Sequence, residues 1–367
     1  MSVPFLDLRV TDKKELHALV EAYRGVLEHG RLVMGPEIED LEAEIAARCS
    51  RQFSVSVGSG TDALFLGLRA LGVGPGDEVI TSSLSWIATA NAIKLTGATP
   101  VFADIGNDLN ISAASVEALI SARTVAILTV NYTGRVADNI VLEHLAGTQG
   151  LLLVEDASQS FGATLEGRAS GSFGNLSAIS HNPMKVLGAT GEAGSITVDD
   201  RYLVDRVRQL RYAGTVDKET CLTPSLNSRM DTVQAAALLV KLSRNATVIE
   251  SRRANAEYYD YAFSDLVAVP PQDSSHVDVY YTYTIRSSRR DELREHLTRL
   301  GIETKIQHPK LMPQQPAYHG SHGEWSEAAN LVKQILCIPI HEKLTMIQRE
   351  RVADAVISFG PSIPEDS

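Results

Sequence analysis

Two polar residues of the chain stand where apolar runs end, in positions that could support chemistry. Asp156 follows the run LLLVE, and a carboxylate there is costly to desolvate unless it meets a cation, such as a protonated ring nitrogen. Lys185 lies between apolar residues and a glycine-rich turn, whereas lysines usually occupy exposed helix faces. A lysine in a desolvated site has a lowered pKa and can act as a Schiff-base nucleophile. The alternatives are that Asp156 caps a helix and that Lys185 lies on a surface loop.

A third segment, residues 58–62 with the sequence GSGTD, lies between an expected strand and an expected helix. Glycine lets backbone amides approach a ligand closely, and the N-terminus of a helix attracts anions. The hydroxyls of Ser59 and Thr61 could donate to the same anion. The alternative is a plain turn in which Thr61 or Asp62 caps the helix. It is not a Walker loop, because no Gly-Lys-Ser/Thr follows. The three segments together suggest an anion cradle, a carboxylate for a ring nitrogen and a reactive lysine.

The elements that must position these segments follow from the hydrophobic pattern. The first 50 residues are expected to be helical, and from residue 53 to 156 short β-branched runs alternate with helical patterns. This alternation is typical of a parallel α/β sheet, in which ligands bind at the carboxyl ends of the strands. A long helical stretch is expected over 231–263, followed by strand 280–286, helix 289–301, strand 302–307 and a closing helix over 348–359. The pattern predicts two domains, residues 1–250 and 251–367.

Composition restricts the class of protein. The 367 residues carry 34 Lys and Arg against 45 Asp and Glu, a net charge of -11, without a basic cluster, which argues against a nucleic-acid partner. No apolar run approaches the roughly 18 residues of a membrane span, and the N-terminus shows no secretory signal. Cys49, Cys221 and Cys337 are distant from one another and odd in number. We therefore expect a cytoplasmic protein with buried free thiols, no metal site and no membrane contact.

Taken in order, these segments resemble the DegT/DnrJ/EryC1/StrS family of sugar and cyclitol aminotransferases, which are pyridoxal-phosphate (PLP) enzymes of fold-type I. The similar blocks cover nearly the whole chain: VPFLDL, GRLVMGPEIEDLEAEIA, VGSGTDALFLGLRALGVGPGDEVITSSLSWIATANAI, TPVFADI, VEDASQSFGA, SHNPMK with GEAG, SLNSRMDTVQAA, LGIETKIQHP and IPIHEKLT. The resemblance implies an α/β fold with a mostly parallel central sheet, flanking helices and a smaller C-terminal α+β domain.

The resemblance also implies roles for residues at matching positions. Lys185 matches the lysine that holds PLP covalently as the internal aldimine, and Asp156 matches the aspartate that pairs with the pyridinium nitrogen. Gln159 matches the residue near the phenolic oxygen of the cofactor. Lys185, released by the amino donor, would then act as the general base, with ping-pong kinetics.

Further matches concern the cofactor's phosphate and ring. Gly60, Thr61 and Ser180 match phosphate-binding positions, and Trp86 matches an aromatic residue that stacks on the pyridine ring, although without the resemblance core packing is the preferred interpretation of Trp86. Asn227 resembles an asparagine that reaches the phosphate from the partner subunit. The resemblance therefore implies a homodimer whose active sites are shared between subunits.

Two blocks depart from the family pattern. Before Lys185 the chain has His181 and Asn182 where the family often has an aromatic run, and residues 306–309 read IQHP where Val-His-Tyr-Pro is common. Both positions tend to face the substrate, which makes Asn182, Gln307 and His308 candidate substrate contacts. The departures leave the substrate open more than the chemistry.

The resulting hypothesis is an aminotransferase that moves an amino group from glutamate or glutamine to a keto-sugar, most simply a nucleotide-linked one. A keto-cyclitol is the alternative within the same class. From another class, the chain could be a non-catalytic regulator or scaffold that kept the fold. A different reaction of the fold, such as aldol cleavage or sulfur removal from cysteine, is a third alternative. A deoxygenating branch of the family replaces the lysine by histidine, and the presence of Lys185 argues against it.

Overall fold

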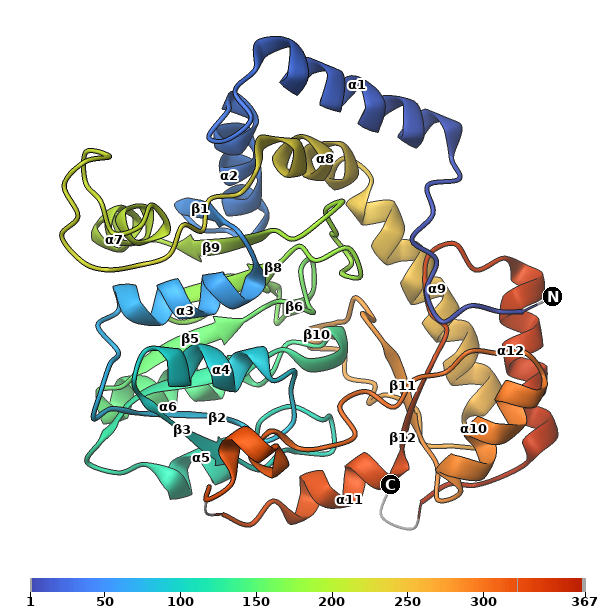
Figure 1. Cartoon of the computed structure of the whole chain (residues 1–367). Coiled ribbons are helices and arrows are strands. Elements are labelled where there is room, and N and C mark those ends of the chain that lie inside the picture. The colour runs from blue at the N-terminus through green and yellow to red at the C-terminus, as the bar shows by residue number, and fades with distance from the viewer. Residues whose placement is uncertain (1, 322, 365–367) are drawn as a thin grey trace.

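A seven-stranded sheet forms the centre of the computed structural model, which describes residues 2–321 and 323–364 (Figure 1). Its strands are, in spatial order, β1 (Phe53–Val57), β9 (Gly194–Val198), β8 (Leu176–Ser180), β5 (Leu152–Asp156), β4 (Thr124–Val130), β2 (Glu78–Ser82) and β3 (Thr99–Ala103). β9 runs antiparallel to both its neighbours, and the pairings among β8, β5, β4, β2 and β3 are parallel. The expected mostly parallel sheet is confirmed.

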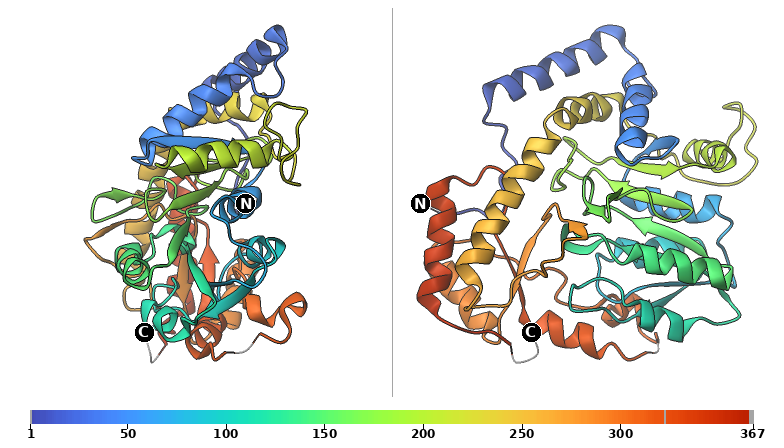
Figure 2. Two further views of the ribbon diagram at one scale, coloured as in Figure 1. Left: turned by 90° about the vertical axis from the view of Figure 1, so that its left-hand side faces the viewer. Right: turned by 180° about the vertical axis from the view of Figure 1, so that it is seen from behind.

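Helices cover both faces of this sheet (Figure 2). One face packs against α3 (Gly60–Ala70), α4 (Ala88–Leu95) and α7 (Arg201–Arg211), and the other against α5 (Ala113–Leu119), α6 (Asn139–Gln149), α2 (Pro36–Arg48) and α8 (Thr232–Leu242). Within β5, Val154 belongs to the core under α3, whereas Leu153 belongs to the core under α6. A strand buried on both faces reads as a continuous apolar run, which explains the pattern LLLV.

The first helix, α1 (Lys13–His29), lies outside these layers. Asp12 caps its N-terminus by accepting from the backbone N–H of Lys14, and Gly30 ends it in the left-handed conformation. α1 packs along α8 and projects from the rest of the molecule (Figure 1). Its other side exposes Leu16, Val20 and Leu27, an apolar surface that the chain by itself does not cover.

A second core surrounds a two-stranded antiparallel sheet. Its elements are β11 (Tyr283–Arg286), β12 (Ile335–Ile338), α9 (Asn245–Phe263), α10 (Arg290–Arg299) and α12 (Met346–Phe359). The expected helical stretch 231–263 is divided into α8 and α9. Residue 250 lies inside α9, so a boundary there would cut a helix, and the division into domains 1–250 and 251–367 stays a proposal. Residues 1, 322 and 365–367 of those two domains lie outside the described residues.

The expected strand over 302–307 is wrong. This segment forms only isolated bridges, Val3 with Ile302 and Lys305 with Cys337, and the partner of β11 is instead β12. At the end of the segment Gln307 is buried and His308 adopts a left-handed φ of 52°, so the chain turns there. The hydrophobic pattern of 302–307 could not reveal this turn, since it depends on what the two side chains contact.

The remaining elements are short or peripheral. They are α11 (Ser326–Gln334), the small sheet of β6 (Thr164–Leu165), β7 (Arg168–Ala169) and β10 (His276–Val277), and 3-10 turns at Tyr132–Gly134, Met312–Gln314 and Pro316–Tyr318. Cys49 and Cys337 are buried free thiols, but Cys221 is exposed, which corrects the expectation that all three are buried. Among the described residues, none of the helices is both long and apolar enough to cross a bilayer.

Candidate active site

The segment expected to bind an anion, residues 58–62, lies beside the end of β8 and the start of β9. Gly60 lies so close to Ser180 that an added Cβ would come 2.5 Å from the serine Cβ, and a Cβ on Gly194 would come 2.3 Å from the Ser59 carbonyl oxygen. Both positions therefore require glycine. Ser59 caps α3 by accepting from the backbone N–H of Asp62 at 3.1 Å, so neither Thr61 nor Asp62 is the cap. The N-terminus of α3 and Ser180 together offer donors to an anion.

Asp156 lies at the carboxyl end of β5, next to β8, which ends in Ser180. It is buried, and its carboxylate accepts from the Thr89 hydroxyl at 3.3 Å and from the backbone N–H of Ser158 at 3.1 Å. Burial raises the pKa of Asp156, while these bonds and the charge of Lys185 act in the opposite direction. The Ser158 bond belongs to a turn, so Asp156 does not cap a helix. Because both donors are uncharged, the site favours a cation in contact with Asp156.

Lys185 lies in the turn region between β8 and β9. Its backbone N–H donates to the Asn182 carbonyl at 2.9 Å, and its Nζ lies 4.4 Å from the centroid of the Tyr281 ring. Burial lowers the pKa of Lys185 to about 8, although Asp156 and Glu192 attract its proton. Lys185 is partly buried and its amine packs against the Tyr281 ring, so the surface-loop alternative does not describe it.

Gln159 connects the sheet edge with the C-terminal half of the chain. Its Oε1 accepts from the backbone N–H of Thr133 at 3.0 Å and from the Gln307 side-chain amide at 3.4 Å. Gln159 and Gln307 are both buried. Two residues named from the sequence thus meet, although 148 positions separate them.

Trp86 and His308 form an aromatic pair, with ring centroids 5.8 Å apart. Trp86 is 61% exposed, so it is not a core residue and its ring face remains available for stacking. His308 Nδ1 lies 2.9 Å from the hydroxyl of buried Tyr132. Burial, reinforced by Lys305 and Lys185, lowers the pKa of His308 to about 3, so its imidazole is neutral at physiological pH.

The side chains of Asn182 and Asn227, two further candidates from the sequence, bond to residues close to them in the chain. The Asn182 side-chain amide donates to Glu192 Oε1 at 2.7 Å, so it joins the two ends of the segment that carries Lys185. Asn227 is exposed, and its side-chain oxygen accepts from Arg229 at 2.8 Å. Within this chain the structure does not bring Asn227 to Lys185 or Asp156.

Several neighbours of the site were missed from the sequence: Thr89, Tyr132, Thr133, Glu192 and Tyr281. Tyr132 and Thr133 come two and three residues after the end of β4, so the rule that ligands lie at strand ends could have found them. Tyr281 gives no such signal, because it belongs to a distant segment that only packing brings to Lys185.

His181 is a buried residue with a structural function. Its Nε2 lies 3.0 Å from the Ser195 hydroxyl and its Nδ1 3.2 Å from the Leu187 carbonyl, so it ties the beginning of the Lys185 segment to β9. Burial lowers the pKa of His181 from its ordinary 6.5 to about 4.

This shift predicts a loss of stability in mild acid. Because the unfolded chain binds the proton more tightly, the contribution of His181 is complete above pH 6.5 and is lost as the pH falls toward 4. We expect the free energy of unfolding to fall by about 2 kcal/mol from this residue between pH 7 and pH 5. Urea titrations of the wild type and of His181→Gln at both pH values measure it, since His308 contributes equally to both proteins. An equal loss in both would contradict the prediction.

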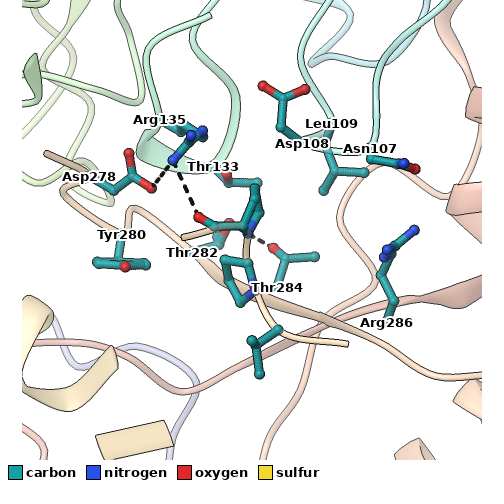
Figure 3. Close-up of a pocket in the computed structure, with 13 residues that line it drawn as sticks. Asn107, Asp108, Leu109, Thr133, Arg135, Asp278, Tyr280, Thr282, Thr284 and Arg286 are labelled. Atoms are coloured by element: carbon teal, nitrogen blue, oxygen red, sulfur yellow. Dashed lines mark hydrogen bonds and ion pairs between the residues drawn. The ribbon is translucent and has the colours of Figure 1, made fainter. Parts of the chain in front are cut away.

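A small polar cavity lies between the loops after β3 and β4 and the strand β11 (Figure 3). Arg135 crosses it and donates to Asp278 at 3.0 Å. About 30 Å³ of it is open to water, against about 230 Å³ in a second cavity bordered by Lys185, Lys241 and Lys343. The cavity in Figure 3 therefore has room for water but not for a sugar.

Comparison with known proteins places this geometry in a family. The DegT/DnrJ/EryC1/StrS aminotransferase family matches residues 13–357. A dTDP-3-amino-3,4,6-trideoxy-alpha-D-glucose transaminase of Streptomyces venezuelae is 40% identical over 99% of this chain and 97% of its own length. A protein of Geobacillus stearothermophilus named pleiotropic regulatory protein is 35% identical over 98% of this chain and 99% of its own.

Solved structures of aminotransferases have the same fold as this chain. A crystal structure of S. venezuelae DesV in complex with a ketimine intermediate superimposes with a TM-score of 0.95, at 39% identity and with 98% of each chain covered. A Brucella abortus aminotransferase of the same family superimposes at 0.94, with 30% identity, over 98% of this chain and 99% of its own. The chain belongs to the DegT/DnrJ/EryC1/StrS aminotransferase family, and it is an aminotransferase with the fold of that family.

Proposed function

We propose that the protein uses PLP to transfer an amino group from glutamate or glutamine to a keto-sugar carried on a nucleotide. The observation that carries this proposal is the buried carboxylate of Asp156, which has only uncharged donors, beside a lysine whose pKa is lowered to about 8. That combination suits a protonated ring nitrogen on one side and a Schiff-base amine on the other.

The described residues fit this cofactor. The glycine that an added Cβ would drive into Ser180 leaves room for a phosphate at the N-terminus of α3, with Gly60, Thr61 and Ser180 as its donors. Trp86 offers an exposed ring face, and the Gln159 side chain is held by its bonds to Thr133 and Gln307. In this proposal Lys185 holds the cofactor covalently and Asp156 faces its ring nitrogen.

When bound, PLP supplies an electron sink for the electrons released at the substrate carbon. Asp156 holds the proton on the ring nitrogen, because an ionised carboxylate in a buried site stabilises a cation in contact with it. With PLP bound, the free amine of Lys185 would move the proton from the donor's α-carbon. The pKa near 8 leaves a substantial neutral fraction of Lys185 at physiological pH. The same Lys185 amine would return a proton when the ketone is aminated, and two such half-reactions would give ping-pong kinetics.

The nucleotide-linked sugar rests on the relatives. The S. venezuelae relative acts on a dTDP-sugar, and a Pseudomonas aeruginosa relative, 33% identical over 93% of this chain, is a UDP-2-acetamido-2-deoxy-3-oxo-D-glucuronate aminotransferase. The neutral imidazole of His308 and the amide of Gln307 are suited to hydrogen-bond sugar hydroxyls. A keto-cyclitol offers the same hydroxyls and remains the alternative substrate.

A homodimer with shared sites is the second part of the proposal. Asn227 lies at the end of a loop that exposes Val216, Leu222 and Leu226, so a second copy could cover this loop and receive Asn227 in its site. Mixing inactive Lys185→Ala and Asn227→Ala proteins under exchange tests this. Each mixed dimer would hold one intact site, so about a quarter of the wild-type activity should return if subunits exchange at random. No recovery, with mixed dimers present by mass, would contradict the sharing.

The spectrum of the purified protein tests the chemistry. A visible band that glutamate or glutamine abolishes would establish the first half-reaction and identify the donor, and its return with a keto-sugar or a keto-cyclitol would identify the acceptor. A band that no donor changes would favour a regulatory protein, the function that the name of the Geobacillus relative suggests. The absence of a band after added PLP would overturn the proposal.

A further inference from the structure

The segment that carries Lys185 has no regular secondary structure. β8 ends at Ser180 and β9 begins at Gly194, and residues 181–193 between them have few backbone hydrogen bonds, among them His181 N–H to the Ala193 carbonyl at 2.8 Å and Ala189 N–H to the His181 carbonyl at 2.7 Å. Side chains that bind this segment from outside therefore add to the internal contacts, such as Asn182 with Glu192, that set the position of Lys185.

Two side chains of α8 bind it. Gln234 Oε1 accepts from the backbone N–H and the hydroxyl of Thr190, each at 3.0 Å. Lys241 Nζ donates to the carbonyl oxygens of Gly188 at 2.7 Å and Ala189 at 3.4 Å. The two residues are seven positions apart, which is about two helical turns, so they lie on the same face of α8.

The contact at Gly188 extends to Lys185 itself. A Cβ on Gly188 would come 2.6 Å from the Pro183 carbonyl oxygen, so the turn is closed upon the residues directly before Lys185. The ammonium group of Lys241 thus binds one end of a tight loop whose other end leads into Lys185. Burial lowers the pKa of Lys241, but Glu15 favours its charged form. A charged donor to main-chain oxygens is a strong restraint in such a site.

We propose that Lys241 is a positioning residue that holds the turn 183–189 and thereby keeps the Lys185 amine against Tyr281 and near Asp156. This inference rests on the proposed function of Lys185 as the Schiff-base lysine. Without the Lys241 ammonium group, the Gly188 and Ala189 carbonyls lose their donor, the turn loosens and water reaches the Lys185 amine. The cofactor then binds to a less ordered lysine.

The chain offers a matched control. Lys343 borders the same cavity as Lys241 and also donates to two main-chain carbonyls, those of Asp7 at 3.0 Å and Arg9 at 2.5 Å. It restrains the N-terminal segment instead of the Lys185 turn. Lys241→Met and Lys343→Met therefore each remove one partly exposed ammonium group that donates to main-chain carbonyls, and Lys241→Arg restores a cation that reaches the carbonyls.

The first measurement uses cofactor-free protein. The rate at which acetic anhydride modifies Lys185 is followed against pH by peptide mass spectrometry, while Asp156, Glu192 and Tyr281, the groups that face its amine, stay unchanged. In the wild type we expect a midpoint near pH 8. In Lys241→Met we expect the midpoint to rise by about one pH unit as water reaches the amine. Lys343→Met and Lys241→Arg should keep the wild-type midpoint.

The second measurement is the dissociation constant of PLP, followed by the visible absorbance of the lysine-bound cofactor, with thermal unfolding measured in parallel. Lys241→Met should bind PLP about tenfold more weakly, the effect expected for losing a charge-assisted hydrogen bond. Lys241→Arg should recover most of this loss. Lys343→Met should lower the melting temperature to a similar extent as Lys241→Met and leave PLP binding unchanged.

The outcomes separate the two proposals. If borohydride reduction of the wild-type holoenzyme does not place the cofactor on Lys185, the proposed function fails and this inference fails with it. If the cofactor is on Lys185 but Lys241→Met behaves like Lys343→Met in both measurements, only the positioning function is overturned. If Lys241→Met does not fold, normal binding and midpoint in Lys241→Arg support the inference, and their loss in a stable Lys241→Arg protein overturns it.

Discussion

Replacing Lys185 by alanine is expected to abolish transamination while the protein remains folded. The variant has neither the amine that holds the cofactor nor the base that moves the substrate proton, so kcat should fall by about 10⁴-fold or more. The side chain is partly buried and donates no hydrogen bond that the fold requires, so the melting temperature of the cofactor-free protein should change little. Turnover in the presence of both substrates is the measurement.

Two further variants make this test specific. Lys185→Arg keeps a positive charge but cannot form a Schiff base, so it should be as inactive as the alanine variant. Lys94→Ala removes an exposed lysine near the end of α4 and should leave turnover unchanged. Full turnover in Lys185→Ala would remove the chemical basis of the proposed function.

Asp156→Asn is expected to lose about 10³-fold in kcat, because an amide cannot hold a proton on the ring nitrogen as a carboxylate does. The same substitution is not expected to reduce the stability of the cofactor-free protein. The folded protein raises the pKa of Asp156, so the contribution of this residue to folding is present below its ordinary pKa and lost as the pH rises through the folded value. At pH 7 the cofactor-free Asp156→Asn protein should therefore be as stable as the wild type or more stable.

Urea unfolding of the cofactor-free protein, together with the rate of the donor half-reaction in a stopped-flow spectrometer, measures both effects. A destabilised Asp156→Asn protein with normal half-reaction rates would contradict the assignment.

Glu155, the residue before Asp156, is also a buried carboxyl group, but we expect it to stabilise the fold and to take no part in the chemistry. Glu155 is fully buried and points to the opposite side of β5, where it accepts from Ser177, Asn131 and the backbone N–H groups of Gly171 and Phe173. Glu155→Ala leaves these donors without an acceptor, so it should cost about 3 kcal/mol of stability. The folded fraction should retain kcat within about tenfold, since Glu155 does not face the site.

Much of the fold could be predicted because the hydrophobic patterns of short segments indicate their helices and strands. β5 reads as an apolar run that ends at acidic residues, so this strand and its terminal Asp156 could be found without coordinates. The strand expected at 302–307 failed for the opposite reason. Its pattern suits a strand, but the buried Gln307 and the left-handed His308 turn the chain toward the site. A pattern of a few residues cannot encode that competition between pairing and a distant contact.

The sequence by itself indicated the family, the alternation of strands and helices as far as β5, and the residues with the chemistry, because motif residues and periodicity are local properties. It also placed the glycines at the cradle. Only the tertiary structure decided that Gly60 meets Ser180 across β9, that Tyr281 lies against Lys185, and that Lys241 binds the turn beyond it. These contacts join residues from about 50 to 120 positions apart, and the close packing of the folded interior decides which distant residues meet.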